Sequence, residues 1–192
     1  MGSWEEVEVS TVVATLPPSV GESGSSDDRS TPPDLPLLIE DTCGCRVLFR
    51  DVVPADIDEI RDLHARCSET TLRRRYFGEP NVEELLGWVF DRGEGLAVGA
   101  FVGDRLVGLG HLMAPDWTGA AEVAFMVDDS YQGRRIGTAL VEVVIALGGG
   151  QHYPKLHAEV SLDNGKMRQI LVHRGFSSTP AQGCYGMDRR LS

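Results

Sequence analysis

The sequence lacks any apolar run that approaches the roughly 20 residues needed to span a bilayer. Its first six residues also lack the basic start and the apolar stretch of a secretory signal. We therefore expect a cytoplasmic protein with no membrane partner.

Lysine is nearly absent, because Lys155 and Lys166 are the only two among the 18 basic residues. The net charge is −11, and residues 1–41 hold nine acidic residues against one basic residue. A surface that binds a phosphate backbone needs clustered Lys and Arg, so we expect no nucleic-acid partner. The acidic balance suits a cationic substrate such as an amine better.

Cysteine is scarce and has no metal-site spacing. Cys43 and Cys45 could form half of a metal site, but no second Cys or His pair stands at matching spacing. With Cys67 and Cys184 they are expected to be reduced structural thiols, and no metal is expected.

The N-terminal part differs in composition from the rest of the chain. Proline, serine, glycine and acidic residues fill 17–28, and three more prolines follow before residue 37. Such a segment cannot bury enough apolar surface to offset the entropy lost on ordering. Residues 7–16 alternate loosely and either form an edge strand or stay mobile. We predict a mobile acidic tail over 1–43 and one folded domain over 44–192.

From Arg46 onward, apolar residues recur with the periods of strands and helices. Helices are predicted from Pro54, over 82–89, over 136–147 up to the glycines at 148–150, and over 165–173. Strands are predicted over 47–49, 96–102, 107–113, 122–127 and 156–162, with a last pair through Phe176 and 185–191. A hairpin turn is expected at 103–105. This order predicts an α/β protein with a mixed sheet.

A strand over 122–127 leads through a short loop directly into the helix at 136. The first turn of a helix leaves backbone N–H groups unpaired, and the helix dipole favours an anion there. A diphosphate would fit a cradle formed by Gln132, Gly133, Arg134, Arg135, Ile136, Gly137 and Thr138. Gly137 would allow close approach, and the two arginines would add charge. On residue types alone, a strand–turn–helix that binds nothing is an equal alternative.

Residues 131–140, Tyr-Gln-Gly-Arg-Arg-Ile-Gly-Thr-Ala-Leu, closely resemble the acetyl-CoA loop of the GNAT superfamily of N-acetyltransferases. That loop is usually written Gln/Arg-x-x-Gly-x-Gly/Ala, so Gln132 and Gly137 match, and Arg135 replaces the first glycine. A positive φ at Arg135 would carry a steric cost, so we expect a helical conformation there. Residues 161–167 and the Gly175-Phe176 pair extend the resemblance, which covers roughly 45–191.

The resemblance implies a mostly antiparallel central sheet flanked by helices, with acetyl-CoA as co-substrate. It implies that Glu122 is the general base, and that Met126 and Val127 pair with the pantetheine arm like an added strand. The Val127 N–H would donate to the thioester carbonyl. Asn164 either binds the pantetheine or caps the last helix, a task that Asp163 could also perform.

Leu171 stands where many relatives keep a tyrosine that protonates the departing thiolate. Tyr185, Cys184 or His173 could substitute, or no acid is needed, because a thiol of this kind titrates near 8.5. Two other features favour structural roles. His111 is expected to be a packed strand histidine rather than part of an acceptor pocket. The run 73–75 of three arginines is expected to be a solvated helix face rather than a site for an acidic patch.

These features predict direct transfer of an acetyl group to a primary amine in a ternary complex. Residues 68–78 and Glu122 resemble bacterial protein lysine acetyltransferases of the Pat type, so a protein lysine is the favoured acceptor. A small amine, such as an aminoglycoside or a polyamine, is the alternative acceptor. Leu171 and Arg135 leave open a non-catalytic acyl-CoA-binding sensor. The oligomeric state is not decided by the sequence.

Overall fold

The computed structural model describes residues 35–91, 95–113 and 119–191, so the predictions for residues 7–16 and 17–28 lie outside the described part. The N-terminal half contains β1 (Leu37–Glu40), β2 (Arg46–Asp51), a 3-10 turn at Pro54–Asp56, α1 (Ile57–Arg66), α2 (Glu69–Tyr76), α3 (Val82–Leu86) and a π-helical stretch at Gly87–Asp91. The rest contains β3 (Gly95–Val102), β4 (Arg105–Met113), β5 (Ala120–Val127), a 3-10 turn at Asp129–Tyr131, α4 (Ile136–Gly150), β6 (Lys155–Ser161), α5 (Gly165–His173), β7 (Ser177–Ala181) and β8 (Cys184–Arg190).

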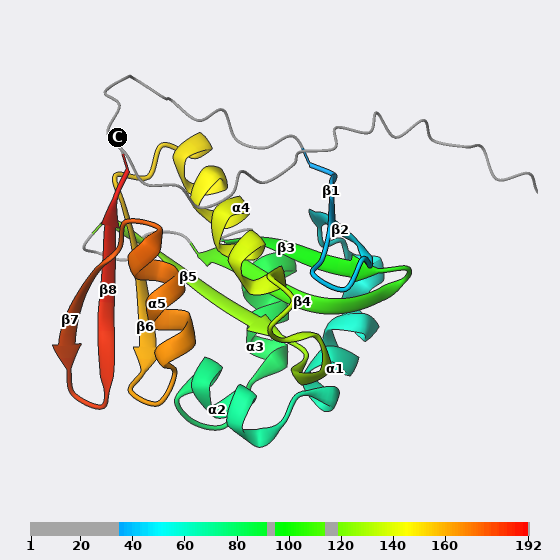
Figure 1. The fold of residues 1–192 in the computed structure, drawn as a ribbon, viewed down its shortest axis with the longest axis horizontal. Helices are drawn as coiled ribbons and strands as arrows, with labels where there is room; N and C mark the ends of the chain where they lie inside the picture. Colours follow the sequence, from blue (N-terminus) through cyan, green and yellow to red (C-terminus); the bar gives the residue numbers. More distant parts are fainter. Residues whose placement is uncertain (1–34, 92–94, 114–118, 192) are drawn as a thin grey trace, which may run out of the picture.

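The described strands form one eight-stranded sheet in the order β1-β2-β3-β4-β5-β6-β8-β7. Neighbours are antiparallel except for β5 and β6, which are parallel and pair only over 120–122 and 155–157. Beyond this short seam the two strands diverge toward their C-terminal ends (Figure 1). The predicted α/β fold with a mostly antiparallel mixed sheet is confirmed.

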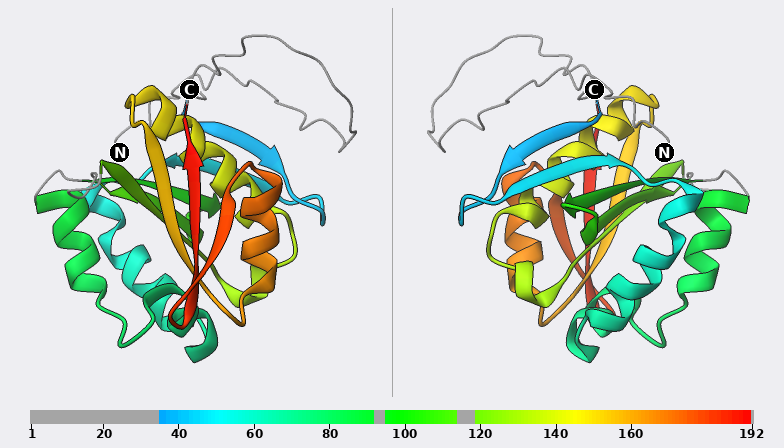
Figure 2. Two further views of the ribbon diagram at one scale, coloured as in Figure 1. Left: turned by 90° about the vertical axis from the view of Figure 1, so that its left-hand side faces the viewer. Right: turned by 90° about the vertical axis from the view of Figure 1, so that its right-hand side faces the viewer.

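Helices cover both faces of the sheet (Figure 2). On one face α1 and α3 pack against Leu109 and Met126, which are partners on β4 and β5. On the other face α4 and α5 pack against Leu112 and Val123, which are partners three residues further along the two strands. Because side chains alternate along a strand, β5 contributes to both layers.

Several predicted elements are present in the structure. The helix predicted from Pro54 begins as a 3-10 turn and continues as α1, which buries Ile60 and Leu63. The hairpin at Gly103 is a two-residue turn, because Val102 pairs with Arg105, and Gly103 has a φ of 60°. Among the described helices, none combines the length and apolar character that crossing a bilayer requires.

Helix α4 extends further than predicted. It runs through the three glycines to Gly150 rather than ending before them. A Cβ on Gly148 would lie 2.9 Å from Leu156 Cδ2 of β6, so this glycine permits close packing of helix on strand rather than ending the helix.

The predicted domain boundary at residue 43 falls inside the sheet. Leu37–Glu40 form β1, which pairs with β2, and Ile39 is buried opposite Val47. Prolines before this short apolar run, and acidic residues on both sides of it, gave it the composition of the preceding tail. The sheet therefore begins before residue 43.

Helix α2 was not predicted from apolar periodicity, although the arginine run 73–75 was expected to lie on a helix face. Its sequence, Glu-Thr-Thr-Leu-Arg-Arg-Arg-Tyr, has no apolar stripe at helical spacing. Ser68 caps its start by accepting a hydrogen bond from the Thr71 N–H, and Phe77 ends it in the left-handed conformation. This helix packs against β5 and β6 and contributes to the site described next.

Candidate active site

A cavity of about 750 Å³ opens where β5 and β6 diverge. Its walls come from α2, the C-terminal half of β5, the loop before α4, the first turn of α4, and α5 with the loop that precedes it. Phe125, Met126 and Val127 form the wall on β5, so both predicted strand residues line the cavity.

The loop that joins β5 to α4, residues 128–135, is anchored by a buried carboxylate. Asp128 accepts hydrogen bonds from the Ser130 N–H and hydroxyl and forms ion pairs with Arg66 and Arg105. Burial raises the pKa of Asp128, but the bonds from Ser130 and then the two arginines outweigh it, so the pKa is lowered. The loop is thereby held between α1 and β4.

Helix α4 begins without a side-chain cap. By contrast, α2, α3 and α5 are capped by Ser68, Asn81 and Asn164. The first turn of α4 also contains no acidic residue. Its amide N–H groups and the positive end of the helix dipole are therefore available to an anion in the cavity.

Gly137 lines the cavity in this first turn. A Cβ built there would meet only Val127 Cγ2, at 3.7 Å, which is an ordinary contact. Packing within the protein therefore does not require glycine at this position. The missing side chain instead leaves room beside the helix start, and the role of Gly137 in cofactor binding stays a prediction.

The expectation that Arg135 is helical is wrong. Arg135 is the N-cap of α4 and has φ 70° and ψ 0°, in the left-handed region. The chain must reverse there to pass from the loop into the helix, and a glycine would do so without steric cost. Arg135 does line the cavity together with Gln132, Gly133 and Thr138.

Two residues of the predicted cradle do not line the cavity. Arg134 turns away, stacks on the Tyr131 ring and donates to the Ser130 carbonyl, and its Nη1 lies 3.8 Å from Asp41 Oδ2. Ile136 is buried in the core. Of these two, Ile136 could contribute only its backbone.

The wall formed by α5 resolves an alternative left open by the sequence. Asn164 caps α5, because its Oδ1 accepts a hydrogen bond from the Met167 N–H at 3.3 Å, and it also lines the cavity. Asp163 does not cap the helix. Leu171 is fully buried in the core, whereas His173 lines the cavity.

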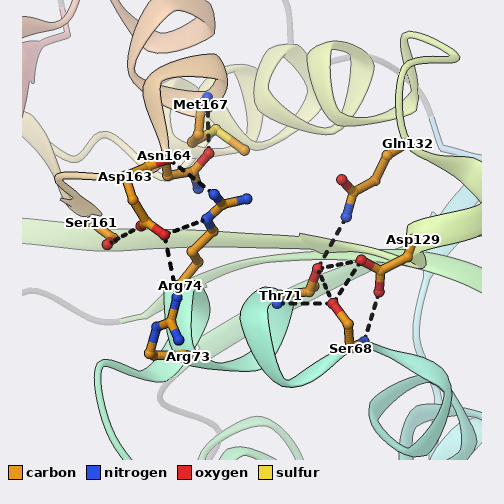
Figure 3. Close-up of polar contacts among 10 residues, drawn as sticks. All are labelled: Ser68, Thr71, Arg73, Arg74, Asp129, Gln132, Ser161, Asp163, Asn164 and Met167. Atoms are coloured by element: carbon orange, nitrogen blue, oxygen red, sulfur yellow. Dashed lines mark hydrogen bonds and ion pairs between the residues drawn. The ribbon is translucent and has the colours of Figure 1, made fainter.

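Helix α2 lines one side of the cavity and is held by polar contacts at both ends (Figure 3). At one end Thr71 donates to Asp129 at 2.8 Å and accepts from the Gln132 amide at 3.2 Å. At the other end Arg74 is paired with Asp163 of the loop before α5. We call α2 with these contacts the α2 strap. Sequence reasoning missed its role, although the Ser68 cap was a readable signal for a helix.

The arginine run 73–75 is a solvated face only in part. Arg73 and Arg74 lie on the surface, but Arg75 points inward, donates to the fully buried His111 and stacks 4.6 Å from the Tyr76 ring centre. His111 does not line the cavity, in agreement with the packed role predicted for it, whereas Arg75 does.

Glu122 lies at the opposite end of β5 from the α4 loop. It pairs with Met113 of β4 and with His157 of β6, inside the short seam where β5 and β6 still pair. Its side chain is exposed and is not part of the cavity lining. The structure does not bring Glu122 into the cavity, and its role as a base stays a prediction.

The other candidates for a proton donor lie elsewhere. Tyr185 stacks under Arg168, and Cys184 is buried on β8, where burial raises its pKa. The four cysteines are unpaired, and within residues 35–91, 95–113 and 119–191 no group of three or more His, Cys, Asp or Glu could hold a metal ion.

Comparison with known proteins identifies relatives of this chain. The model of the acetyltransferase (GNAT) family matches residues 57–176. Acetyltransferase Pat of Mycolicibacterium smegmatis is 30% identical over 154 residues, which cover 73% of this chain and 44% of the relative. The chain thus spans less than half the length of this curated relative.

Solved structures share the fold. The GNAT domain of S. lividans PAT superposes with a TM-score of 0.72 at 20% identity, covering 80% of this chain and 96% of that domain. The paia N-acetyltransferase of Thermoplasma acidophilum, solved in complex with coenzyme A, superposes with a TM-score of 0.57 at 15% identity, covering 75% and 98%.

Proposed function

This chain belongs to the acetyltransferase (GNAT) family, and from that premise we propose that its cavity binds acetyl-CoA for transfer of the acetyl group to a primary amine. The acceptor we favour is a lysine side chain of a protein. We place the reaction in the cytoplasm, as the sequence led us to expect.

One observation carries the proposal: the start of α4 is uncapped, free of acidic residues and open to the cavity at Gly137. These features fit the diphosphate of coenzyme A, which needs exposed amide donors and a close backbone approach. Arg135 and Lys166 add positive charge to the same lining. Gln132, Gly133, Arg135, Gly137 and Thr138 would hold the phosphates.

The pantetheine arm would lie along β5, where β6 has diverged and no longer pairs with it. Its amides would pair with the backbone of Met126 and Val127 like an added strand. In this arrangement the Val127 N–H would stabilise negative charge that develops on the thioester oxygen. Asn164 lines the opposite wall.

The attacking amine must first lose a proton, because a lysine ammonium has a pKa near 10.4. We assign this step to Glu122, acting through a water, since its carboxylate lies outside the cavity lining. The amine nitrogen then bonds to the carbonyl carbon and the carbon–sulfur bond breaks. The nitrogen loses its second proton to give the amide, and the departing coenzyme A thiolate takes up one proton to become the thiol. His173 and Lys166 are the titratable side chains of α5 in the cavity lining.

Two features support a protein lysine as acceptor. Glu122 is exposed, so a side chain on another protein can reach it. Residues 68–78 and Glu122 resemble bacterial protein lysine acetyltransferases, and the relative at 30% identity is named Acetyltransferase Pat. A non-catalytic acyl-CoA sensor is the alternative that the buried Leu171 favours.

Incubation with isotopically labelled acetyl-CoA and a panel of proteins and small amines tests the proposal, with mass spectrometry as the readout. Label on a protein lysine is the expected result. Label on an aminoglycoside or polyamine alone would show that the acceptor is a small amine rather than a protein lysine. Binding of acetyl-CoA without transfer would favour the sensor, and no binding at millimolar concentration would overturn the proposal.

A further inference from the structure

Arg75 is an enclosed cation without an anionic partner in the described part of the chain. Its guanidinium donates to His111 and stacks over the Tyr76 ring, and no carboxylate of residues 35–91, 95–113 and 119–191 forms an ion pair with it. Its neighbours on the same helix behave differently, because Arg73 and Arg74 both reach Asp163. Arg75 also lines the cavity.

The groups that touch Arg75 are themselves neutral near pH 7. Burial lowers the pKa of His111 well below its ordinary value, with Arg75 and then His64 adding to the shift. Burial raises the pKa of Tyr76, whose hydroxyl donates to His64 Nε2 at 2.5 Å. Burial lowers the pKa of Arg75, and the opposing effects of Tyr76 and then of Glu122, which forms no ion pair with it, are smaller. The positive charge is therefore not compensated by contact with an anion.

An enclosed charge with neutral partners is costly, because desolvation is offset only by pairing or by strong hydrogen bonds. The fold accepts this cost at a position that faces an open cavity. A ligand that places an anion there would recover the lost interaction energy.

The strand register locates this cation along the cavity. Its partner His111 pairs with Ala124 of β5, three residues before Val127, where the α4 loop begins. At about 3.3 Å per residue, Ala124 lies roughly 10 Å from the end of β5. Arg75 thus lies away from the phosphate-binding helix start and toward Glu122. The phosphates of coenzyme A and the anion at Arg75 are different groups.

We propose that Arg75 forms a carboxylate-binding subsite at the inner end of the cavity, beside the position where acyl transfer takes place. The inference rests on the proposed function. The carboxylate belongs either to the acyl group of an acyl-CoA or to the acceptor. A planar guanidinium matches a carboxylate through two parallel N–H donors, which an ammonium cannot do.

The first arm of the test concerns the acyl group. Calorimetry on the full chain compares succinyl-CoA with butyryl-CoA, which has the same four acyl carbons without the carboxylate, and uses acetyl-CoA as the reference. If the acyl group carries the anion, succinyl-CoA binds about 10- to 100-fold more tightly than butyryl-CoA. Arg75→Met removes that preference and leaves the affinity for acetyl-CoA within about threefold.

The second arm concerns the acceptor. With saturating acetyl-CoA, kcat/KM is measured for two lysine peptides that differ by Glu or Gln beside the lysine. If the acceptor carries the anion, the Glu peptide is preferred by about 10-fold or more, and Arg75→Met removes the preference. Arg75→Lys keeps the positive charge but lacks the two parallel N–H donors of the guanidinium, so it should retain only part of the preference for the Glu peptide.

Arg168→Met is the matched control, because Arg168 stacks 4.5 Å from the Tyr185 ring centre and does not line the cavity. It should leave both preferences intact. A preference in either arm that depends on Arg75 supports the subsite and identifies its source. Two results would overturn the subsite alone. In the first, the protein binds acetyl-CoA but shows no preference in either arm. In the second, a preference exists but survives in Arg75→Met and Arg75→Lys. Failure of the wild type to bind any acyl-CoA overturns the proposed function as well.

Discussion

Arg74 and Asp163 join the two sides of the cavity mouth. Arg74 Nε donates to Asp163 Oδ2 at 3.2 Å, and its Nη2 donates to the Asp163 carbonyl oxygen at 3.0 Å. Asp163 is itself held by the Ser161 hydroxyl. Since Thr71 and Ser68 donate to Asp129 at the other end, the α2 strap is tied to two loops that line or flank the cavity (Figure 3).

Asp163→Asn should loosen the strap without unfolding the protein. The pair is exposed, and exposed ion pairs contribute little to stability. We expect an unchanged melting temperature and an acetyl-CoA dissociation rate that rises about two- to fivefold, measured by stopped flow. Asp58→Asn, which removes an exposed partner of Arg61 in the first turn of α1 and away from the cavity lining, is the control. An unchanged dissociation rate would show that the strap does not retain the ligand.

The Arg74–Asp163 ion pair should make the effect of Asp163→Asn on the acetyl-CoA dissociation rate depend on pH. The Ser161 hydroxyl lowers the pKa of Asp163, and the charges of Arg74 and Arg73 add to it against a smaller opposing effect of burial. A lowered pKa means that the interaction is complete above the ordinary aspartate pKa and is lost as pH falls through the folded value. The acetyl-CoA dissociation rates of the wild type and of Asp163→Asn should therefore become equal only at acidic pH.

Gly137→Ala should weaken acetyl-CoA binding without a loss of stability. The added methyl meets only Val127 Cγ2 within the protein, so the fold tolerates it, but it enters the space assigned to the diphosphate. We expect at least about a 10-fold loss of affinity by calorimetry and no drop in melting temperature. Gly149→Ala, later in the same helix with nothing within 4 Å of the new Cβ, should stabilise the helix and leave affinity unchanged. Native affinity in Gly137→Ala would contradict the phosphate site.

Arg135→Gly should raise stability while it lowers affinity. Glycine removes the steric cost of the left-handed backbone, a gain of about 1 kcal/mol. The same change removes a cation from the cavity lining. Arg135→Ala keeps the strain and loses only the charge, so both variants should bind acetyl-CoA more weakly, but only glycine should raise the melting temperature. Equal melting temperatures would mean that the strain is released elsewhere.

Glu122→Gln should keep acetyl-CoA affinity and lower turnover by roughly 10²–10⁴, because proton removal from the amine is lost. Glu159→Gln is the matched control, since Glu159 is an exposed carboxylate on the neighbouring strand β6. Steady-state rates with the identified acceptor provide the measurement. A variant as active as the wild type would remove Glu122 as the base.

We propose that the folded domain begins before β1, and two truncations can test this. Deletion of residues 1–34 should leave the melting temperature unchanged. Deletion of 1–41 removes β1, exposes the surface that Ile39 buries, and should cost about 2–4 kcal/mol of unfolding free energy. Equal melting temperatures for the two truncations would restore the boundary near residue 43.

The elements that sequence reasoning found have strong local signals. Helix α4 shows a continuous apolar stripe from Ile136, and the hairpin at Gly103 has its turn glycine. Strand β1 and helix α2 have no such signal, because β1 is four residues long and α2 buries none of its residues. Strand β1 is stabilised by pairing with the next strand, β2, and α2 by contacts with Asp129 and Asp163 far along the chain, so periodicity within either segment could not reveal them.

The site was predictable where it depends on one continuous segment. Gln132 and Gly137, in the loop and first turn predicted to bind a diphosphate, lie together in the cavity lining, and their binding role stays a prediction. The conformation of Arg135 and the outward turn of Arg134 depend on how the loop is anchored through Asp128, to which Arg66 and Arg105 are paired from other elements. The inward position of Arg75 depends on His111, on a different element. Long-range contacts of this kind are not visible in the residue pattern.

Strands β5 and β6 are connected by three residue pairs. The sheet therefore consists of two parts that are joined by a short stretch of strand pairing. Five strands lie on one side of this stretch and three on the other. A ligand bound along β5 would connect the two parts of the sheet and resist their bending relative to each other. The molecule should therefore be mechanically softer when the cavity is empty than when it is filled.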